Sequence, residues 1–578
     1  MKKRVVALVT CCMMLVLAAC GNAANNNSNN NNNTPSEPVG ELSSDPVLAE
    51  AGLTDDLKFV EARTISVGLW NRVEDVEAAD TIWAKHIAKE LLEKHNIIVE
   101  WEPVPRWDET EFQSTLLSAQ SAPDVGYTFN AGMITTMAQM GAVHNLYPIL
   151  EQYGDLLPNL YAQVTEDNIY WNFDVAKEEM FNIAGRRASE GIQNTATFIR
   201  EDWLEALGLP VPTSTAEFEA TLLAFRDRAS ELPGVAEGII SENDIIPYII
   251  TEDAAWDARG LLDSFIPEDV TEREWFVYGF DDRRFMFKDA MKDGLRILNQ
   301  WYNEGLLWND FALSDVNDGQ DLIRLGVVGA LHANWDLPFR SGDAWTATMR
   351  ENIGENANYI TINPFENDKG VQRVFASGPV DRFVYFPTTN DEIVASLLYL
   401  DFMSTPEILD FLQFGIEGTH HEVNEDGILQ MLSSENWPLD EQMSGSRNFD
   451  VTPLVNGIWY DLIDRDRALE TASLGYPGIE SEAILDAFNM ALENTQVFRN
   501  ALTRVRASEE GKSVPLIDQR NQILHRLIAG VSPENFDAEF EREYAIYMEL
   551  GGTAIVEERE QAWIETFGDV DSMPEVGE

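Results

Sequence analysis

The segment RTISVGL at residues 63–69 decides the fold, because apolar side chains alternate along it with small or polar ones. A period of two predicts a half-buried β-strand. Residues 81–94 then carry pairs of apolar residues every four positions, which predicts a helix with one apolar stripe, and alternation resumes at residues 97–101. A strand, a helix and a second strand in this order form a βαβ unit, so we expect the chain to open as an α/β domain.

A further helix and strand extend this unit. Residues 110–120 have a helical pattern, and residues 123–127 are typical of the next strand. In an open α/β sheet, ligands bind outside the carboxyl ends of the strands. We therefore expect a binding site to include residues that directly follow these strands. They are Trp70, Asn71 and Arg72 after the first strand, and Tyr127, Phe129 and Asn130 after the third, with Trp70, Arg72, Tyr127 and Asn130 as the principal candidates.

Trp335 is a further candidate, because it follows an apolar segment at residues 326–331 that is typical of a strand. It joins the same site only if that strand enters the same sheet. Exposed aromatic rings beside amide and charged groups suit sugars, since the C–H faces of a sugar stack on aromatic planes and its hydroxyls bond to polar side chains. The alternative is that these aromatic residues belong to the core.

The rest of the chain is rich in helical patterns. They occur at residues 287–302 and 391–403 and over most of residues 481–567, and Pro406 is expected to open another helix. The charged residues of the C-terminal region are most simply the solvated faces of amphipathic helices.

The composition excludes several classes of function. The 578 residues are enough for about two to four domains. They include 40 Lys or Arg but 99 Asp or Glu, which gives a net charge of −59 at pH 7. Binding to nucleic acid requires clustered basic residues, so we expect no nucleic-acid partner.

The cysteines and histidines predict neither a disulfide nor a metal site. The three cysteines, Cys11, Cys12 and Cys20, all lie near the N-terminus. The histidines show no H-E-x-x-H or comparable spacing, and in a strand or loop the adjacent pair His420 and His421 would point apart. We therefore expect no bound metal and no cofactor.

Residues 1–19 predict a signal peptide, because basic residues precede an apolar run that is too short to span a bilayer. The sequence Leu-Ala-Ala-Cys-Gly that follows resembles the lipobox of bacterial lipoproteins, which implies that the mature chain begins at a lipidated Cys20. An ordinary signal peptide with an incidental cysteine is the alternative. Residues 20–60, which include an asparagine-rich tract, are expected to form a flexible tether.

Several motifs occur in the order found in one family. They are Ser121–Val125, Phe198–Pro210, Trp301–Leu306 and Phe414–Gly418. Together with the lipobox and the early βαβ unit, these motifs resemble extracellular solute-binding proteins of carbohydrate ABC importers. The resemblance covers nearly all of residues 60–570 and is strongest to the large Gram-positive lipoprotein branch related to alginate-oligosaccharide-binding proteins.

The resemblance implies an α/β fold with two lobes, of the periplasmic-binding-protein type II, and a helix-rich C-terminal part. By order along the chain, lobe 1 would comprise residues 61–185 and 325–390, and lobe 2 residues 186–324 and 391–578. The lobes would hold a ligand in the cleft between them and close over it by a hinge motion.

The resemblance also implies site residues in the second half of the chain. Glu417 matches the glutamate of a Gly-x-Glu-Gly turn in the alginate receptors, and His420 stands where relatives can present an aromatic ligand contact. Trp256 and Trp275 lie where an aromatic platform of the second lobe is expected. For Glu417, a turn carboxylate that caps nearby backbone is the alternative. Many relatives carry a calcium loop, but residues 233–248 lack its alternating oxygen ligands, so we expect no calcium there.

The function that the resemblance implies is capture of an oligosaccharide and its delivery to the permease subunits of an ABC importer, with no chemistry on the ligand. The protein would be a monomer, held by its lipid on the extracellular face of the bacterial cell membrane. Two alternatives remain: a carbohydrate-active enzyme at the cell surface, and a binding protein for a peptide or a sensory ligand. No motif singles out the carboxylate pair that a glycosidase needs.

Overall fold

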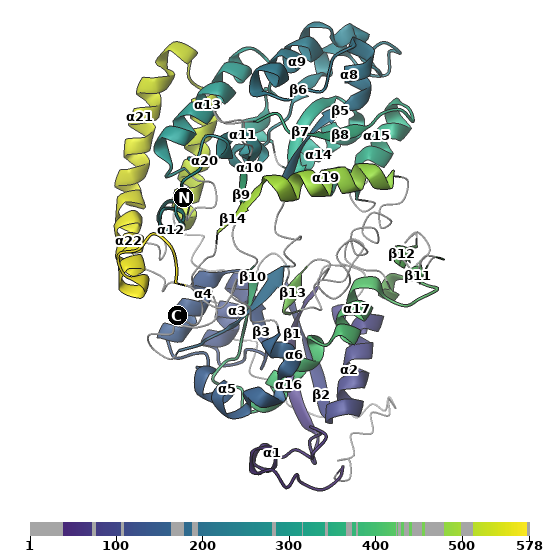
Figure 1. Ribbon diagram of the computed structural model, residues 1–578, viewed down its shortest axis with the longest axis vertical. Helices are drawn as coiled ribbons and strands as arrows, with labels where there is room; N and C mark the ends of the chain where they lie inside the picture. The colour runs from purple at the N-terminus through teal and green to yellow at the C-terminus, as the bar shows by residue number, and fades with distance from the viewer. Residues whose placement is uncertain are drawn as a thin grey trace, which may run out of the picture.

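The computed structural model has two lobes, drawn one above the other in Figure 1. We call the lower one lobe 1 (described parts of 39–187 and 380–456) and the upper one lobe 2 (described parts of 195–376 and 479–574). The signal peptide, Cys20 and Arg72 lie outside the described residues. The structure describes residues 39–71, 77–105, 109–162, 179–187, 195–279, 285–314, 316–340, 345–365, 373–376, 380–423, 425, 429–432, 438–441, 453–456, 479–498 and 513–574.

Lobe 1 is built on a sheet with the strand order β2-β1-β3-β10-β4-β13. β1 and β2 pair in parallel, and backbone hydrogen bonds from Gly68 to Val125 and from Val125 to Ser66 join β1 to the β3 strand. β10 is antiparallel to both of its neighbours. The strands of this lobe are β1 (Arg63–Asn71), β2 (Ile97–Pro105), β3 (Gly126–Thr128), β4 (Ile183–Arg187), β10 (Val380–Tyr385) and β13 (Val455–Asn456), with a separate hairpin of β11 (His421–Val423) and β12 (Leu429–Met431).

The helices of lobe 1 bury the stripes expected from the sequence. In α2, Trp83, Ile87 and Leu91 are each fully buried against the sheet. α16 is apolar on all sides and packs against β1, α2 and α6, so it is the central helix of the lobe. The helices are α1 (Pro46–Ala51), α2 (Ile82–His95), α3 (Glu109–Ser118), α4 (Ala131–Gln139), α5 (Tyr147–Tyr153), α6 (Pro158–Tyr161), α16 (Ile393–Met403) and α17 (Pro406–Phe414), with short 3-10 turns η1 (Ala78–Asp80), η2 (Gly154–Leu156) and η9 (Leu439–Glu441).

Lobe 2 contains a second sheet with the order β6-β7-β5-β8. β6 and β7 are parallel, and β5 runs antiparallel to both β7 and β8. A short parallel pair, β9 and β14, lies beside it on the side of lobe 1 (Figure 1). The strands are β5 (Thr195–Arg200), β6 (Ile246–Tyr248), β7 (Val328–Asn334), β8 (Tyr359–Ile362), β9 (Val374–Ala376) and β14 (Thr495–Val497).

Helices cover this second sheet and extend to one side of it. The buried face of α13 includes Leu295, Leu298 and Trp301. The α-helices are α8 (Glu201–Leu207), α9 (Thr215–Asp227), α10 (Ala254–Asp257), α11 (Arg259–Asp263), α12 (Glu272–Tyr278), α13 (Lys288–Asn303), α14 (Val316–Leu325), α15 (Trp345–Ile353), α19 (Ser481–Asn494), α20 (Ser513–Ala529), α21 (Phe536–Tyr547) and α22 (Thr553–Phe567). The shorter turns are η4 (Ala229–Glu231), η5 (Glu242–Asp244), η6 (Phe311–Leu313), η7 (Leu337–Phe339), η12 (Pro533–Asn535) and a π-turn η13 (Met548–Gly552).

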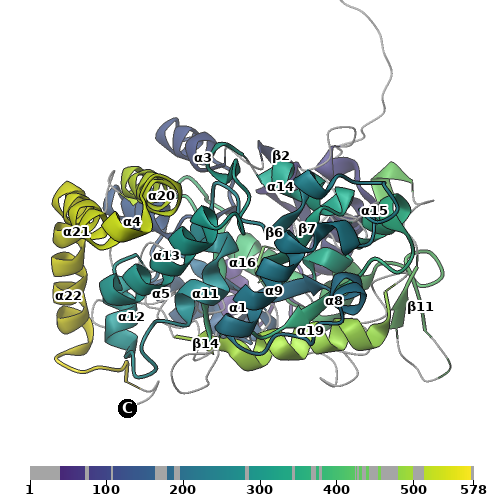
Figure 2. The same cartoon turned by 90° about the horizontal axis from the view of Figure 1, so that it is seen from above.

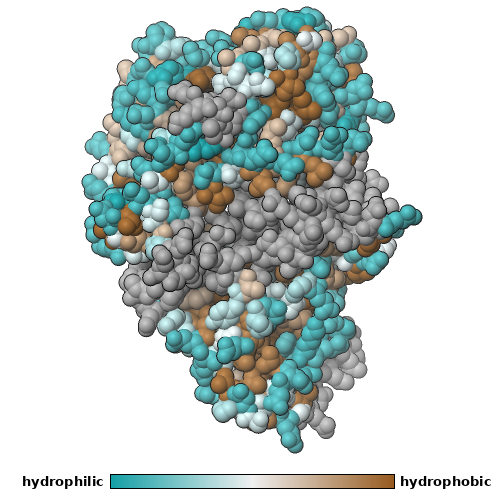
Figure 3. Space-filling model, viewed as in Figure 1, coloured by the Kyte–Doolittle hydropathy of each residue, from teal (hydrophilic) through white to brown (hydrophobic). Residues whose placement is uncertain are grey.

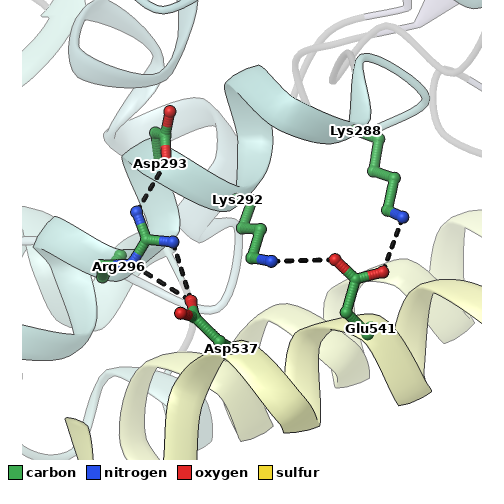
Figure 4. Close-up of polar contacts among 6 residues, drawn as sticks. All are labelled: Lys288, Lys292, Asp293, Arg296, Asp537 and Glu541. Carbon is green, nitrogen blue, oxygen red and sulfur yellow. Dashed lines mark hydrogen bonds and ion pairs between the residues drawn. The ribbon is translucent and has the colours of Figure 1, made fainter. Parts of the chain in front are cut away.

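The C-terminal helix α21 is held to α13 by a ladder of charged contacts (Figure 4). Glu541 accepts hydrogen bonds from Lys288 at 2.6 Å and from Lys292 at 2.8 Å, and Asp537 pairs with Arg296 at 2.7 Å. The three cations also stand over the rings of aromatic residues one helical turn apart on α21, namely Phe536, Phe540 and Tyr544. The two helices are therefore antiparallel partners that join the C-terminal region to lobe 2.

The expected allocation of segments to the lobes is wrong in two places. β7 and β8 pair with β5, so most of residues 325–390 belongs to lobe 2, and only the part from β10 onward lies in lobe 1. Conversely, α16 and α17 lie in lobe 1, because their apolar residues join the core of the first sheet. The chain thus passes from lobe 1 to lobe 2 after β4, returns between β9 and β10, and passes to lobe 2 again after β13.

The expectation of a flexible tether over residues 20–60 is wrong for residues 39–60, and residues 20–38 lie outside the described part of the chain. Residues 39–60 fold onto lobe 1, where Leu53 and Phe59 are buried in its core. The backbone of Val39 bonds to Val60 at 2.9 Å, and His95 Nδ1 lies 2.8 Å from the carbonyl oxygen of Leu57. Among the described helices, none is both long and apolar enough to cross a bilayer.

Candidate functional site

In each lobe, one edge of the sheet lies where the chain crosses to the other lobe. β1, β3 and β4 run parallel, so their carboxyl ends lie at one edge of the lobe 1 sheet. β4 ends at Arg187, and the chain enters lobe 2 at Thr195, which pairs with Asn334 at the end of β7. We call these two sheet edges together the interlobe edge. In Figure 1, β1 runs from the side of α1 toward lobe 2, which agrees with this placement.

The lobe 1 side of the interlobe edge carries a cluster of three aromatic rings. Trp70, at the end of β1, stacks on Tyr127 of β3 with ring centroids 4.9 Å apart and planes inclined by 18°. Phe129 leans against Trp70 at 4.8 Å. Trp70 and Tyr127 are 1% and 2% exposed, whereas Phe129 is only partly buried. The sequence therefore predicted correctly that the ends of β1 and β3 lie together, but Phe129 is the ring that reaches the surface.

Arg382 supports this cluster from the neighbouring strand. Its guanidinium stands 5.1 Å from the ring centre of Phe129 and 5.6 Å from that of Tyr127, and the residue is 1% exposed. β10 can bring it there because its partner across β4 is Gly185, where a Cβ atom would come within 2.5 Å of the Arg382 side chain. Arg382 is not singled out by the sequence, because Asp381 directly precedes it and an Asp-Arg pair in a strand is typical of an exposed position.

The backbone below the rings is fixed by buried polar residues. Gln113 donates a hydrogen bond of 2.7 Å to the carbonyl oxygen of Tyr127 and accepts one of 3.1 Å from the hydroxyl of Tyr385. Asn130 is exposed and caps α4 by accepting from the backbone N–H of Met133. The Oδ1 atom of Asn130 thus caps α4, and the residue directly follows Phe129 at the interlobe edge.

On the lobe 2 side, β7 ends with Asn334 and Trp335. Trp335 is partly exposed and makes an edge-on contact of 5.2 Å with Phe488 of α19. The Oδ1 atom of Asn334 is buried, and no described residue donates a hydrogen bond to it. Buried acceptors are nearly always satisfied in proteins, so this atom is an exception among the described residues. Trp335 follows a strand of the other sheet from Trp70, so the condition under which it would join Trp70 along one sheet is not met.

His332 lies two residues before Asn334 on β7, and its role is structural. Its two ring nitrogens lie 3.0 Å and 2.8 Å from the hydroxyl oxygens of Thr197 and Thr195. Burial, with a smaller effect of the nearby Arg259 charge, lowers the pKa of His332 to about 3. The imidazole is therefore neutral, and it locks β5 to β7 behind the interlobe edge.

Trp256 and Trp275 occupy different environments. Trp256 is partly exposed on α10, with the guanidinium of Arg259 5.1 Å from its ring centre. Trp275 is 4% exposed and stacks on Phe375 at 4.9 Å and on Phe498 at 5.2 Å. Phe375 lies in β9, just before the chain returns to lobe 1, so this stack anchors a crossing segment and gives Trp275 a structural place.

The turn around Glu417 has a clear structural basis. His420 is fully buried, its Nδ1 accepts a hydrogen bond of 2.9 Å from the N–H of Ile416, and its Nε2 lies 3.2 Å from the carbonyl oxygen of Glu441. Gly415 has a φ of 73° and leaves room for His420, since a Cβ there would come within 2.6 Å of the imidazole. Burial lowers the pKa of His420. We therefore withdraw His420 as a ligand contact, whereas Glu417 is exposed beside it.

Other motif residues also hold the fold. Arg200 is fully buried and forms two hydrogen bonds to Asp202, of 2.8 Å and 2.7 Å, and one of 2.7 Å to the carbonyl oxygen of Gly326. Asp124 accepts from the N–H and the hydroxyl of Ser66, which joins β3 to β1. No described group of three or more histidine, cysteine or acidic residues is arranged to hold a metal ion.

Two sheets that are joined by repeated crossings of the chain make a two-lobed α/β fold, and comparisons find the same fold in solved solute-binding proteins. The alginate-binding protein AlgQ2, solved without calcium, is 15% identical, and the match covers 88% of this chain and 98% of that one with a TM-score of 0.60. An HMO-binding, ABC-transporter-associated solute-binding protein from Bifidobacterium longum infantis is 16% identical, over 87% and 99% of the two chains, with a TM-score of 0.60.

Among individual proteins, the chain is similar to two from Bacillus subtilis. Lipoprotein LipO is 25% identical over 336 residues, which are 56% of this chain and 61% of LipO, so the match spans less than two thirds of that relative. The polygalacturonan/rhamnogalacturonan-binding protein YtcQ is 22% identical over 375 residues, or 63% of this chain and 67% of YtcQ. No protein-family model matches the chain. The resemblance to solute-binding proteins that the sequence motifs indicated is confirmed.

Proposed function

We propose that this protein is the substrate-binding lipoprotein of an ABC importer, which captures an oligosaccharide between its lobes and delivers it to the permease without altering it. The observation that carries the proposal is the cluster of Trp70, Tyr127 and Phe129 at the interlobe edge. Only the outermost ring, Phe129, is partly exposed, and the rings beneath it are packed and held by Arg382. This is a rigid aromatic surface on which a sugar ring can stack.

Further polar and aromatic residues of both lobes would contact the other rings and the hydroxyls of an oligosaccharide. On the lobe 2 side, the partly exposed Asn334 stands at the end of β7. Trp335 and Trp256 are partly exposed aromatic surfaces of the same lobe, and Glu417 is an exposed carboxylate of lobe 1. A ligand that contacts both lobes favours the closed arrangement over the open one, which is how capture would be coupled to docking on a permease.

The membrane anchor is part of the same proposal. A lipid on Cys20 and the asparagine-rich residues up to 38 would keep a monomeric receptor close to its importer on the outside of the cell, which raises its effective concentration there. LipO is itself named a lipoprotein, and YtcQ is named for binding polygalacturonan and rhamnogalacturonan, so uronate-containing oligosaccharides belong in the first set of ligands to test.

The test is a calorimetric titration of the protein with neutral and uronate oligosaccharides, with analysis of the sugars afterwards. We expect saturable one-to-one binding and unchanged sugars. Phe129→Ala should weaken binding at least about tenfold, because a stacked aromatic contact is removed. Phe567→Ala is the matched control, since this partly exposed phenylalanine packs on Trp563 of α22 and not on the cluster of Trp70, Tyr127 and Phe129. Cleavage of a sugar, or equal loss of affinity in both variants, contradicts the proposal.

A further inference from the structure

A groove outside the interlobe edge lies on the surface of lobe 2, between η6 and α14. It has a volume of about 450 Å³. Figure 2 places α14 on the side of the molecule opposite α19. The face of the protein seen in Figure 3 is mostly hydrophilic over lobe 2, as the high net charge leads one to expect, so an apolar groove in this lobe requires an explanation.

The apolar lining of the groove is unusually exposed. The short helix η6 turns Phe311 into the core, where it is fully buried, and leaves Leu313 91% exposed. Leu325, at the end of α14, is 51% exposed and lines the same groove. Trp308 forms part of the lining while it packs against the cores on both sides of the lobe 2 sheet. Single exposed leucines are common, but apolar residues that gather around one concavity mark interaction sites.

The charged residues that line the groove are all acidic. Asp310, Asp318 and Asp321 line the groove, and none of its lining residues is basic. Arg324, which does not line the groove, pairs with Asp321 at 2.8 Å. The carboxylates do not converge as a metal site does, since no described group of three acidic or histidine residues is arranged to hold a metal. They therefore flank the apolar lining and surround it with negative potential.

We infer that this groove binds a segment of a partner protein in which apolar side chains are flanked by lysine or arginine. Leucine side chains around a tryptophan floor offer a sugar few hydrogen-bonding groups other than carboxylates, whereas an apolar anchor fills the groove and basic neighbours meet the aspartates. Leu313 is the contact that gains most, because nearly all of its surface is open to water before the partner binds. The site is separate from the interlobe edge, so glycan binding does not depend on it.

The test uses the full chain and a fluorescent peptide with leucines at helical spacing flanked by lysines, measured by anisotropy. Leu313→Ser with Leu325→Ser should weaken binding at least about tenfold, since burial of one leucine alone accounts for that factor. Leu550→Ser is the control for an exposed leucine elsewhere, being 53% exposed on η13. Asp310→Asn with Asp318→Asn should weaken binding and flatten its salt dependence, whereas Glu355→Gln, an exposed acid on the same lobe, should not.

Several results would overturn the inference. A peptide with serine in place of leucine that binds as tightly would show that the acidic surface attracts any cation. Loss of oligosaccharide binding in the Leu313→Ser, Leu325→Ser variant would make the groove a sugar subsite. A dimer of the unaltered protein in sedimentation that this variant abolishes would make a second copy of the chain the occupant.

Discussion

Arg200 provides the sharpest test of which motif residues hold the fold and which hold a ligand. A buried arginine could serve an acidic sugar, but here all of its described hydrogen bonds are internal: two to Asp202 and one to Gly326. Its guanidinium also lies 4.7 Å from the ring centre of Trp203. Arg200→Met leaves the carboxylate of Asp202, which is 7% exposed, without its cation, and breaking a buried pair in this way costs about 3–5 kcal/mol.

The assay is urea unfolding of lobe 2, followed by circular dichroism. With a slope of about 1–3 kcal/mol per M, the midpoint of the Arg200→Met variant should fall by at least about 1 M. Arg228→Met is the matched control, because Arg228 makes the same paired contact with Glu231 but with side chains that are 39% and 50% exposed, so solvent screens the pair and it contributes little to stability. The double variant Arg200→Met, Asp202→Leu should recover much of the loss.

Two outcomes would refute this reasoning. A loss in Arg200→Met no larger than in Arg228→Met would mean that the buried pair does not hold β5 and α8 to β7. Normal stability combined with lost affinity for uronate sugars would show that Arg200 contacts the ligand. The reasoning predicts the opposite pattern, with lower stability and unchanged affinity in the folded protein.

Two further predictions concern pH. Because the pKa of His332 is lowered to about 3 in the folded state, an unfolded chain binds a proton there that the native protein does not as the pH falls below 6.5. The contribution of this residue to the free energy of unfolding is thus complete above pH 6.5 and falls by about 1.4 kcal/mol per pH unit between pH 6.5 and 3. His332→Gln should remove this part of the pH dependence when unfolding curves of the variant and the unaltered protein are compared. An equal pH dependence in the two proteins would contradict a neutral buried imidazole. Hydrogen bonds from Lys288 and then Lys292 lower the pKa of Glu541 to about 2, so its stabilising effect is present above pH 4.5 and is lost as the pH falls toward 2. Glu541→Gln should speed amide exchange in α21 at neutral pH and low salt, with a smaller difference in high salt or near pH 2, and a difference that does not depend on pH or salt would show that these ion pairs are not its cause.

Much of the local structure could be predicted from the sequence. The alternation at residues 63–69 and the stripe at residues 81–94 became β1 and α2, and Pro406 opens α17. These patterns are local, and they depend on which face of one element is buried. The pairing of β7 with β5 could not be predicted in the same way, because it joins residues more than a hundred positions apart, and both sheets accept an apolar strand.

The candidate site was predicted only in part, for a physical reason. Position after a strand indicated Trp70 and Tyr127 correctly as neighbours, but composition cannot tell which ring of a stack is outermost. Phe129 is that ring, and Arg382 comes from a strand far along the chain. His420 looked like a ligand by its place in a motif, yet the left-handed Gly415 beside it shows that the motif encloses the imidazole within a turn.

The central claim is that an oligosaccharide binds between the lobes and draws them together. Small-angle X-ray scattering of the protein, without sugar and then with a saturating oligosaccharide found by calorimetry, tests it most directly. The account predicts a smaller radius of gyration with sugar, and a loss of this change in Phe129→Ala at the same sugar concentration. An unchanged radius of gyration at full saturation would contradict closure over a ligand held at the interlobe edge.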